Sequence, residues 1–291
     1  MQLYTINFLI IIFCSLFYSC EFKFSPNSLD PDCSKKISIK YNKDWLKSIE
    51  KKVGYKDHFK FFITGDPQQR PSDFNKIIKL AEQNKEVDFV VVLGDFTDFG
   101  KEVEFSWGCR VLEQLNKPVF VVIGNHDSTA FGEEIWRDVI GDFNFSFNYN
   151  RVHFVAYNWN LFDILAKKRP QRIQESIDFL KEAASTVVAD KYVAFSHVPA
   201  FSGEFMTLYP TWSQSLQNTL WDYNYSYSFH GHGHHYEHET GIKRVPHHMV
   251  TSSTYGYSIA TIYPNSINIE NCNFDNICIP AQENVRYKKV E

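Results

Sequence analysis

The sequence predicts an α/β fold built around a mostly parallel β-sheet with helices on both faces. Between Phe59 and about residue 127, three apolar runs alternate with two segments of helical spacing. The runs are nearly continuous in Val, Ile and Phe, which is typical of strands buried on both faces. Alternation of strand and helix favours parallel pairing, because a parallel connection needs a crossover and a helix supplies it.

The first half of this region divides into three strands and two helices. The expected strands are FKFFIT, VDFVVVL and KPVFVVI, beginning at residues 59, 87 and 117. Helical spacing of apolar residues in SDFNKIIKLAEQNK predicts a helix between the first two strands. KEVEFSWGCRVLEQLN occupies the same place between the second and third strands, so we expect a second helix there.

The pattern changes after residue 142. FNFSFNYNRVHFVAYN alternates with period two and predicts a β-hairpin that turns near residues 149–151. We expect a helix across PQRIQESIDFLKEAAS, a strand in KYVAFSHVP, and two or three antiparallel strands from His247 to about residue 274. No internal repeat is visible, so we expect one domain over 59–275 and a C-terminal tail over 276–291.

The first twenty residues have the shape of a processed leader. Residues 8–18 form an apolar run too short for a comfortable membrane span, and Ser19-Cys20 follows it. The ending LFYSC resembles a bacterial lipoprotein signal in which Cys20 is lipidated, although the leader has no Lys or Arg and Phe17-Tyr18 is bulky. An ordinary cleaved signal and an uncleaved anchor are the alternatives.

From this leader we expect residues 1–19 to be a signal peptide and Cys20 to be the mature N-terminus. A lipid on Cys20 would tether an exported protein to a membrane, facing the periplasm or the cell surface. Residues 20–58 are then expected to form a polar tether with a short helix near Trp45 to Lys52.

Charge and cysteine usage narrow the functional classes. The formal net charge is −4 and the isoelectric point is near 6.3, so composition gives no support to a nucleic-acid-binding surface. An exported protein can form disulfides, and CNFDNIC allows a small loop between Cys272 and Cys278. We expect Cys109 to be a free, partly buried thiol. No CxxC pair occurs, so a cysteine zinc site is not expected.

Polar residues follow the ends of successive strands. Asp66, Asp95 and the triplet Asn125-His126-Asp127 each follow one of the three parallel strands, and these ends should meet in one crevice. His197 ends a fourth strand, and His232-Gly233-His234 forms a fifth group. Carboxylates, an amide oxygen and imidazoles together suit Mn, Fe or Zn. A carboxylate able to bridge between nitrogen ligands is what a two-metal hydrolytic site requires.

Taken in order, GDPQ, GDFTD, GNHD, a strand-end His and GHGH resemble the motifs of the calcineurin-like metallophosphoesterases. The resemblance covers residues 59 to about 273. It implies a four-layer αββα sandwich with two mixed β-sheets, in which the hairpin and the closing strands belong to the second sheet. It also implies hydrolysis of a phosphate ester by a metal-bound hydroxide at a site for two metal ions. The expected substrate is a nucleotide or another small phosphomonoester or diester, because Phe99 follows Asp98 where the protein serine/threonine phosphatases have Arg.

The resemblance also assigns roles to individual residues. In it, Asp66 and His234 bind the first metal, Asp95 bridges both, and the second metal is held by Asn125, His197 and His232. Gly231 and Gly233 would let the chain turn tightly between the two His ligands. His126 would assist the leaving oxygen, and Asp98 would orient His126.

One position departs from the family pattern. Gln68 stands where many members have His, and an amide oxygen is a weaker ligand than imidazole. DPQ resembles a variant of the first motif, so we take Gln68 as a ligand of the first metal whose effect on affinity and metal identity stays open. A surface lipoprotein that uses the same fold as a binding module is the rival interpretation, and Gln68 is its only support.

Simpler explanations exist for each residue taken alone. A single Asp at a strand end is more often a cap, and a single Asn is more often a turn residue. For the other members of the His-rich region we expect solvated loop positions, namely His235, Glu237, His238, Glu239, His247 and His248.

Overall fold

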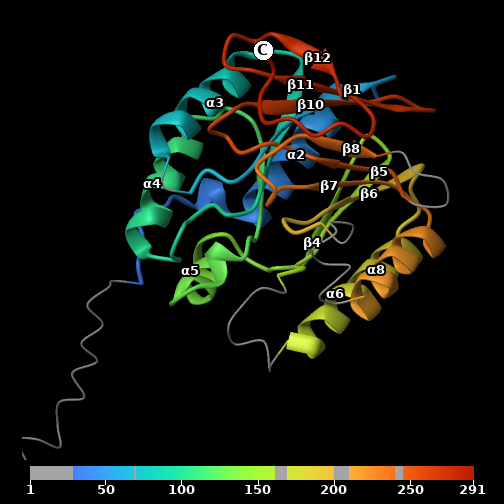
Figure 1. Ribbon diagram of the computed structural model, residues 1–291, viewed down its shortest axis with the longest axis horizontal. Helices are drawn as coiled ribbons and strands as arrows, with labels where there is room; N and C mark the ends of the chain where they lie inside the picture. Colours follow the sequence, from blue (N-terminus) through green and yellow to red (C-terminus); the bar gives the residue numbers. More distant parts are fainter. Residues whose placement is uncertain (1–28, 69, 161–168, 200–209, 240–244) are drawn as a thin grey trace, which may run out of the picture.

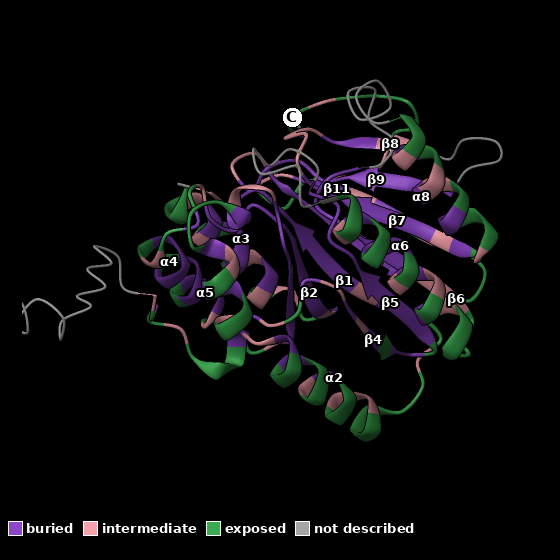
Figure 2. Cartoon of the chain, turned by 90° about the horizontal axis from the view of Figure 1, so that it is seen from below, coloured by how far each residue is buried: buried purple, intermediate pink, exposed green. Residues whose placement is uncertain are grey.

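The computed structural model describes residues 29–68, 70–160, 169–199, 210–239 and 245–291 (Figure 1). Two six-stranded sheets pack face to face, and helices cover their outer faces (Figures 1 and 2). This confirms the predicted four-layer sandwich with two mixed sheets. The predicted leader and Cys20 lie outside the described residues.

The first sheet combines the predicted parallel strands with the C-terminal strands. Its order is β12-β11-β10-β1-β2-β3, with β1, β2 and β3 parallel and the remaining neighbours antiparallel. The strands are β1 (Phe59–Thr64), β2 (Val87–Leu93), β3 (Val119–Val122), β10 (Tyr257–Ile262), β11 (Ile267–Cys272) and β12 (Cys278–Pro280). The pairing of β1 with β10 joins segments about two hundred residues apart, which no local pattern could indicate.

The second sheet has the order β4-β5-β6-β7-β9-β8. Its strands are β4 (Phe145–Tyr149), β5 (Val152–Ala156), β6 (Lys191–Phe195), β7 (Tyr225–His230), β8 (Glu237–Glu239) and β9 (His247–Met249). The predicted hairpin is present, and both turn residues, Asn150 and Arg151, have positive φ as a two-residue hairpin turn requires. Two predictions were wrong. Strand β9 pairs in parallel with β7 and does not join the antiparallel C-terminal strands. Those closing strands, β10 to β12, belong to the first sheet beside β1 and not to the sheet of the hairpin.

Six α-helices and two short 3₁₀ segments are assigned within the described residues. They are η1 (Lys35–Ile37), α2 (Ile39–Val53), α3 (Pro71–Gln83), α4 (Glu102–Leu112), η2 (His126–Ser128), α5 (Gly132–Val139), α6 (Arg169–Thr186) and α8 (Pro210–Asp222). Helices α3 and α4 lie on one side of the sandwich and α6 and α8 on the other (Figure 2). Neither α5 nor α8 was predicted. No helix in the described part of the chain is both long and apolar enough to cross a membrane.

Phenylalanine rings fill the space between the sheets. The ring of Phe61 on β1 lies 5.7 Å from Phe154 on β5, 5.9 Å from Phe195 on β6 and 5.5 Å from Phe229 on β7, centroid to centroid. All four side chains are fully buried. Edge-to-face contacts of this kind add to the free energy gained by burying the rings. Packed Phe side chains therefore hold the two sheets together, which accounts for part of the high Phe content of the chain.

Both ends of the packed body extend beyond the predicted domain. Residues 29–58 are not a polar tether, because α2 buries Leu46 and its Asn42 side chain accepts a hydrogen bond from the backbone of Val119 on β3, at 2.8 Å. A disulfide joins Cys33 to Cys109 on α4, so the prediction of a free Cys109 thiol was wrong. Cys272 and Cys278 form the short-range disulfide that their spacing allowed. At the C-terminus Val290 is only 4% exposed and belongs to the same core as the sheets.

Candidate metal centre

The strand-end residues meet where the two sheets come together. Asp66, Asp95 and Asn125 follow β1, β2 and β3 of one sheet, while His197 and His232 follow β6 and β7 of the other. The His197 ring reaches across to the first sheet, since its Nδ1 lies 2.8 Å from the carbonyl of Leu93. A carbonyl oxygen only accepts, so this contact fixes the proton on Nδ1 and directs Nε2 into the site.

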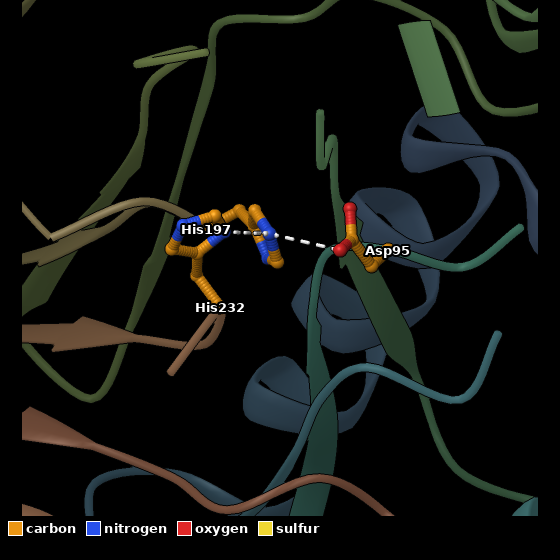
Figure 3. Close-up of side chains that lie close together, drawn as sticks. All are labelled: Asp95, His197 and His232. Carbon is orange, nitrogen blue, oxygen red and sulfur yellow. Dashed lines mark hydrogen bonds and ion pairs between the residues drawn. The ribbon is translucent and has the colours of Figure 1, made fainter. Parts of the chain in front are cut away.

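Three side chains form a compact group of possible metal ligands (Figure 3). One ligand atom from each of Asp95, His197 and His232 lies within 4.8 Å of the other two. His197 Nε2 is 3.2 Å from Asp95 Oδ2 and 3.2 Å from His232 Nδ1. The Oδ1 atom of Asn125 is 3.1 Å from each of the two imidazole nitrogens. A carboxylate oxygen, an amide oxygen and two facing imidazole nitrogens are the donor set expected for a transition metal, so these residues fit one.

A second group lies beside the first. Asp66 is 1% exposed, and its Oδ1 is 3.2 Å from His234 Nε2. The backbone N–H of His232 donates to both carboxylate oxygens of Asp66, at 3.1 Å each. Gln68 points into the same region, but its Nε2 donates to Asp95 Oδ2 at 3.2 Å. In this orientation the amide nitrogen faces the site, so binding a metal through the Gln68 carbonyl requires the amide to turn.

The loops that present these residues adopt an unusual backbone. Asp66, Gln68, Asp95, His232 and His234 all have positive φ, between 39° and 71°. Non-glycine residues rarely adopt this conformation, and such strain concentrates at functional sites.

The predicted role of the two glycines therefore needs correction, because the His ligands and not the glycines bear the positive φ. Gly231 and Gly233 are needed for space instead. A Cβ at Gly231 would lie 2.4 Å from the carbonyl of Leu93, and a Cβ at Gly233 would lie 2.1 Å from the sulfur of Met249.

The site keeps Asp95 ionised although it is buried. Burial alone would raise the pKa of Asp95, but His197 and His126 lower it to about 2. Burial lowers the pKa of His197, whereas Asp95 and Asp66 raise it to about 9. Burial and the neighbouring His197 lower the pKa of His232 to about 3. The group thus combines a charged carboxylate with a neutral imidazole at His232, whereas His197 holds an additional proton that a bound cation would displace.

His126 and Asp98 lie as the family resemblance implied. His126 Nδ1 donates to the backbone carbonyl of Asp98 at 2.8 Å and is 3.4 Å from its Oδ1. The contact turns Nε2 toward the metal centre, 3.9 Å from Asp95 Oδ2. The side chain is 38% exposed, so it can reach a bound substrate. Asp98 therefore orients His126 through its main chain as well as its carboxylate.

Sequence reasoning did not assign a role to Asp127. Its fully buried carboxylate accepts hydrogen bonds from the backbones of Phe96, Thr97 and Gly124 and from the Thr97 hydroxyl, at 2.7–3.2 Å. Burial and the charge of Asp95 raise the pKa of Asp127 to about 6. The residue ties the loop after β2 to the loop after β3. In the sequence, Asp127 could have been recognised as a structural residue from its place in the GNHD motif.

Solvated loop positions were expected for the remaining residues of the His-rich region, and for most of them this was wrong. His235 does lie outside the strands and is partly exposed. Glu237, His238 and Glu239 form β8, and His247 and His248 belong to β9. His248 is fully buried, and His247 is 4% exposed. The expectation failed because these polar residues pair as strands, which is visible only in the folded chain.

A sequence model of the calcineurin-like phosphoesterase family matches residues 59–236, more than half of the chain. A comparison with curated protein sequences gives no match. The matched range includes every predicted ligand from Asp66 to His234. It ends before β9 and the C-terminal strands, which complete both sheets.

Several solved structures are similar in fold. GAP50, described as the anchor in the inner membrane complex of Plasmodium, aligns with a TM-score of 0.58 and 14% identity, over 80% of this chain and 89% of its own. Purple acid phosphatase PPD1 from yellow lupin (Lupinus luteus) seeds aligns with a TM-score of 0.60 and 12% identity. The alignment covers 80% of this chain and 54% of the phosphatase chain. A dimetal phosphatase from Danio rerio aligns with a TM-score of 0.54 and 15% identity. The alignment covers 77% of this chain and 99% of the phosphatase chain. At these identities the likeness shows the fold alone.

Proposed function

The chain belongs to the calcineurin-like phosphoesterase family, and from this premise we propose that it hydrolyses a small phosphate ester at a site for two metal ions. Membership makes the protein a metal-dependent phosphoesterase, a hydrolase of phosphate esters. The number of metal ions, the substrate and the roles of single residues are our proposal.

The position of Asp95 is the observation that carries the proposal. Its Oδ2 lies 3.2 Å from His197 Nε2 and also accepts from Gln68 Nε2 at 3.2 Å, so one oxygen contacts a member of each proposed ligand group. The residue before it, Gly94, accepts the backbone N–H of Asp66 at 3.0 Å, which keeps the Asp66–His234 pair close. An ionised carboxylate between two ligand groups is suited to hold two cations at once.

The proposed assignments follow from these contacts. Asp66 and His234, with Gln68, hold one cation, and Asn125, His197 and His232 hold the other. Two bound cations, of Mn, Fe or Zn, would supply positive charge to the phosphoryl oxygens and lower the pKa of a water from about 16 toward about 7. His126 is held so that its Nε2, when protonated, delivers a proton to the leaving oxygen.

An exposed aromatic residue next in sequence to Asp98 favours a nucleotide among the possible substrates. Phe99 is 47% exposed. It directly follows Asp98, the residue that orients His126. The ammonium group of Lys101 lies 4.7 Å from the centre of this ring. An aromatic ring stacks on a nucleobase, and a cation near it attracts phosphate.

The test compares esters and metals directly. The purified protein is loaded separately with Mn, Fe, Zn or Mg and assayed with a nucleoside monophosphate, an alkyl phosphomonoester and a phosphodiester. Asp95→Asn should abolish hydrolysis, with a loss of at least about a hundredfold, because the bridging charge is removed while the shape is kept. Phe99→Ala should raise KM for the nucleotide only. Hydrolysis that persists undiminished in Asp95→Asn would rule out the proposed site.

The alternative function is that of a binding module. It is favoured by one observation, the similarity in fold to a structure described as an anchor in Plasmodium. A folded wild-type protein with no hydrolysis under any metal would favour this alternative. Metal binding without turnover would do the same. The two proposals therefore differ in one measurement, which is turnover by the metal-loaded protein.

A further inference from the structure

A second cluster of possible metal ligands lies on β8 and β9, apart from the ligands described above. It contains Glu237 and Glu239 of β8 and His247 of β9. One ligand atom from each residue lies within 4.8 Å of the other two, as is also true of Asp95, His197 and His232. None of the three residues belongs to the proposed phosphoesterase site.

The register of the two strands explains why these side chains meet. Glu239 pairs directly with His247, and Glu237 lies two residues along the same strand, so all three point to one face. Their neighbours His238 and His248 point to the opposite face, where the ring of His248 lies 6.2 Å from Phe229 in the core. The cluster is therefore built by strand pairing and is not an accidental meeting of loop side chains.

The cluster is largely shielded from solvent and contains two carboxylates. Glu237 is 6% exposed and His247 is 4% exposed, while the Glu239 side chain is 33% exposed. Arg286 Nη2 donates to Glu237 Oε1 at 2.7 Å, and His235 Nε2 lies 3.1 Å from Glu237 Oε2. Burial alone would raise the pKa of Glu237, but His235 and Arg286 lower it to about 2. Among the described residues Arg286 is paired with Glu237, and a cation between Glu237 and Glu239 would relieve the repulsion between their carboxylates.

We propose that Glu237, Glu239 and His247 bind a Zn²⁺ ion at a site separate from the phosphoesterase centre. Zinc takes imidazole and carboxylate ligands together, at about 2 Å from each, which places neighbouring ligand atoms about 3–4 Å apart. His247 Nε2 and Glu239 Oε2 are 4.0 Å apart and need little movement to reach this separation. Each carboxylate oxygen has two lone pairs, so Glu237 can keep Arg286 and still bind the ion.

Occupancy of this site would stiffen the loop that carries two ligands of the other centre. His235 Nδ1 donates to the carbonyl of Gly233 at 2.6 Å, and Gly233 lies between His232 and His234. The same His235 ring contacts Glu237 through Nε2. A Zn²⁺ ion that fixes Glu237 therefore acts on the His232–His234 loop through one imidazole. The inference goes beyond the proposed function, because the site would bind zinc even in a chain that hydrolyses nothing.

The experiment measures bound zinc per chain in the full-length protein after equilibration with Zn²⁺ and removal of the excess. Glu239→Gln should bind one zinc fewer than wild type, whatever number the phosphoesterase centre holds. The partly exposed Glu239 can be changed to Gln without burying a new charge, and circular dichroism checks that the variant is folded. His247→Gln should lose the same single ion. Zinc should also raise the thermal midpoint less in these variants than in wild type.

Two controls separate this proposal from the proposed function. Glu270→Gln, on β11 of the other sheet, should keep the wild-type zinc content. Asp95→Asn should lose zinc from the phosphoesterase centre and still lose one further ion when combined with Glu239→Gln. Zinc content unchanged by both Glu239→Gln and His247→Gln would overturn the second site, even if ester hydrolysis is present. Loss of hydrolysis in Asp95→Asn with one zinc retained would support both proposals.

Discussion

At the scale of single residues, the centre depends on side chains held in strained or buried positions. Asp95 has positive φ, is 2% exposed and has a pKa lowered to about 2, so its charge is kept at the junction of the two sheets. Asp127 and Asp98 position the neighbouring residues through hydrogen bonds to and from the main chain. We therefore expect function to depend on groups that orient the proposed ligands as well as on the proposed ligands themselves.

His126→Gln should lower kcat by about a hundredfold to ten-thousandfold, because it removes the proton donor for the leaving oxygen. KM and bound metal should change little, since no ligand of either cation is altered. Steady-state kinetics and metal analysis measure both. His58→Gln, a histidine that stacks on Tyr263 at 5.3 Å, serves as the matched control. A His126→Gln enzyme with kcat within about threefold of wild type would contradict the assignment.

At the scale of elements, two connections hold the N-terminal segment on the sandwich. The Cys33–Cys109 disulfide joins this segment to α4, and α2 contacts both β3 and β4. Helix α2 also provides Lys43, whose charge acts on His153 in β5. The segment before β1 thus contributes to the stability of both sheets.

Removing the long-range disulfide should destabilise the protein more than removing the short-range one. The two bonds close loops of 76 and 6 residues, and the chain-entropy model gives about 4 and about 2 kcal/mol for such loops. We expect this order for the variants with both cysteines of a pair changed to Ala, from urea unfolding at equilibrium. Equal losses in the two double variants would show that the N-terminal segment is held by other contacts.

Stability should fall as the pH is lowered through the range where His153 titrates. Burial, with a contribution from Lys43, lowers the pKa of His153 to about 4, whereas an unfolded His titrates near pH 6.5. Between these values the unfolded chain binds more protons, so the unfolding free energy decreases from pH 6.5 toward pH 4. The His153 share is about 2 kcal/mol at pH 5.

Urea unfolding at pH 7.5 and pH 5 measures this effect as the difference between the wild type and His153→Gln. The variant should lose less stability on acidification than the wild type. His58→Gln, as a control, should show the wild-type dependence on pH. An identical pH dependence in wild type and His153→Gln would contradict the assignment of the neutral imidazole.

At the scale of the whole molecule, the sandwich brings together the proposed ligands from two sheets. Each sheet alone offers an incomplete set, since Asp66, Asp95 and Asn125 follow strands of one and His197 and His232 follow strands of the other. The rings packed around Phe61 set the distance between the sheets, so the core determines the spacing of the ligands.

We also propose that the whole protein is exported and attached to a membrane by a lipid on Cys20, which follows the apolar leader. Cys20→Ser should move the protein from the membrane fraction to the soluble fraction, because a lipid anchor tethers without spanning. Hydrolytic activity should be unchanged, and Cys33→Ser serves as a control that should stay with the membrane. Membrane fractionation with immunodetection reads the result, and a Cys20→Ser protein that remains membrane-bound would disprove the lipid anchor.

The sequence by itself determined the local elements, the ligand motifs and the family. Val-rich strands and the Phe74, Ile77, Ile78 and Ala81 stripe of α3 have periods that follow from burial, so they are readable without a structure. GDFTD, GNHD and GHGH are also local, because each ligand is presented by a few consecutive residues. The residues proposed for the site could therefore be named from the sequence, whereas the structural role of Asp127 could not.

Only the tertiary structure decided which distant segments pair. The partnership of β1 with β10, the place of β9 beside β7, the Cys33–Cys109 bond and the cluster at Glu239 and His247 all depend on contacts between residues far apart in the chain or on strand register. Strand register and loop closure are set by the free energy of the whole packed core. A one-dimensional pattern records which face a residue prefers, but it does not record which partner lies opposite.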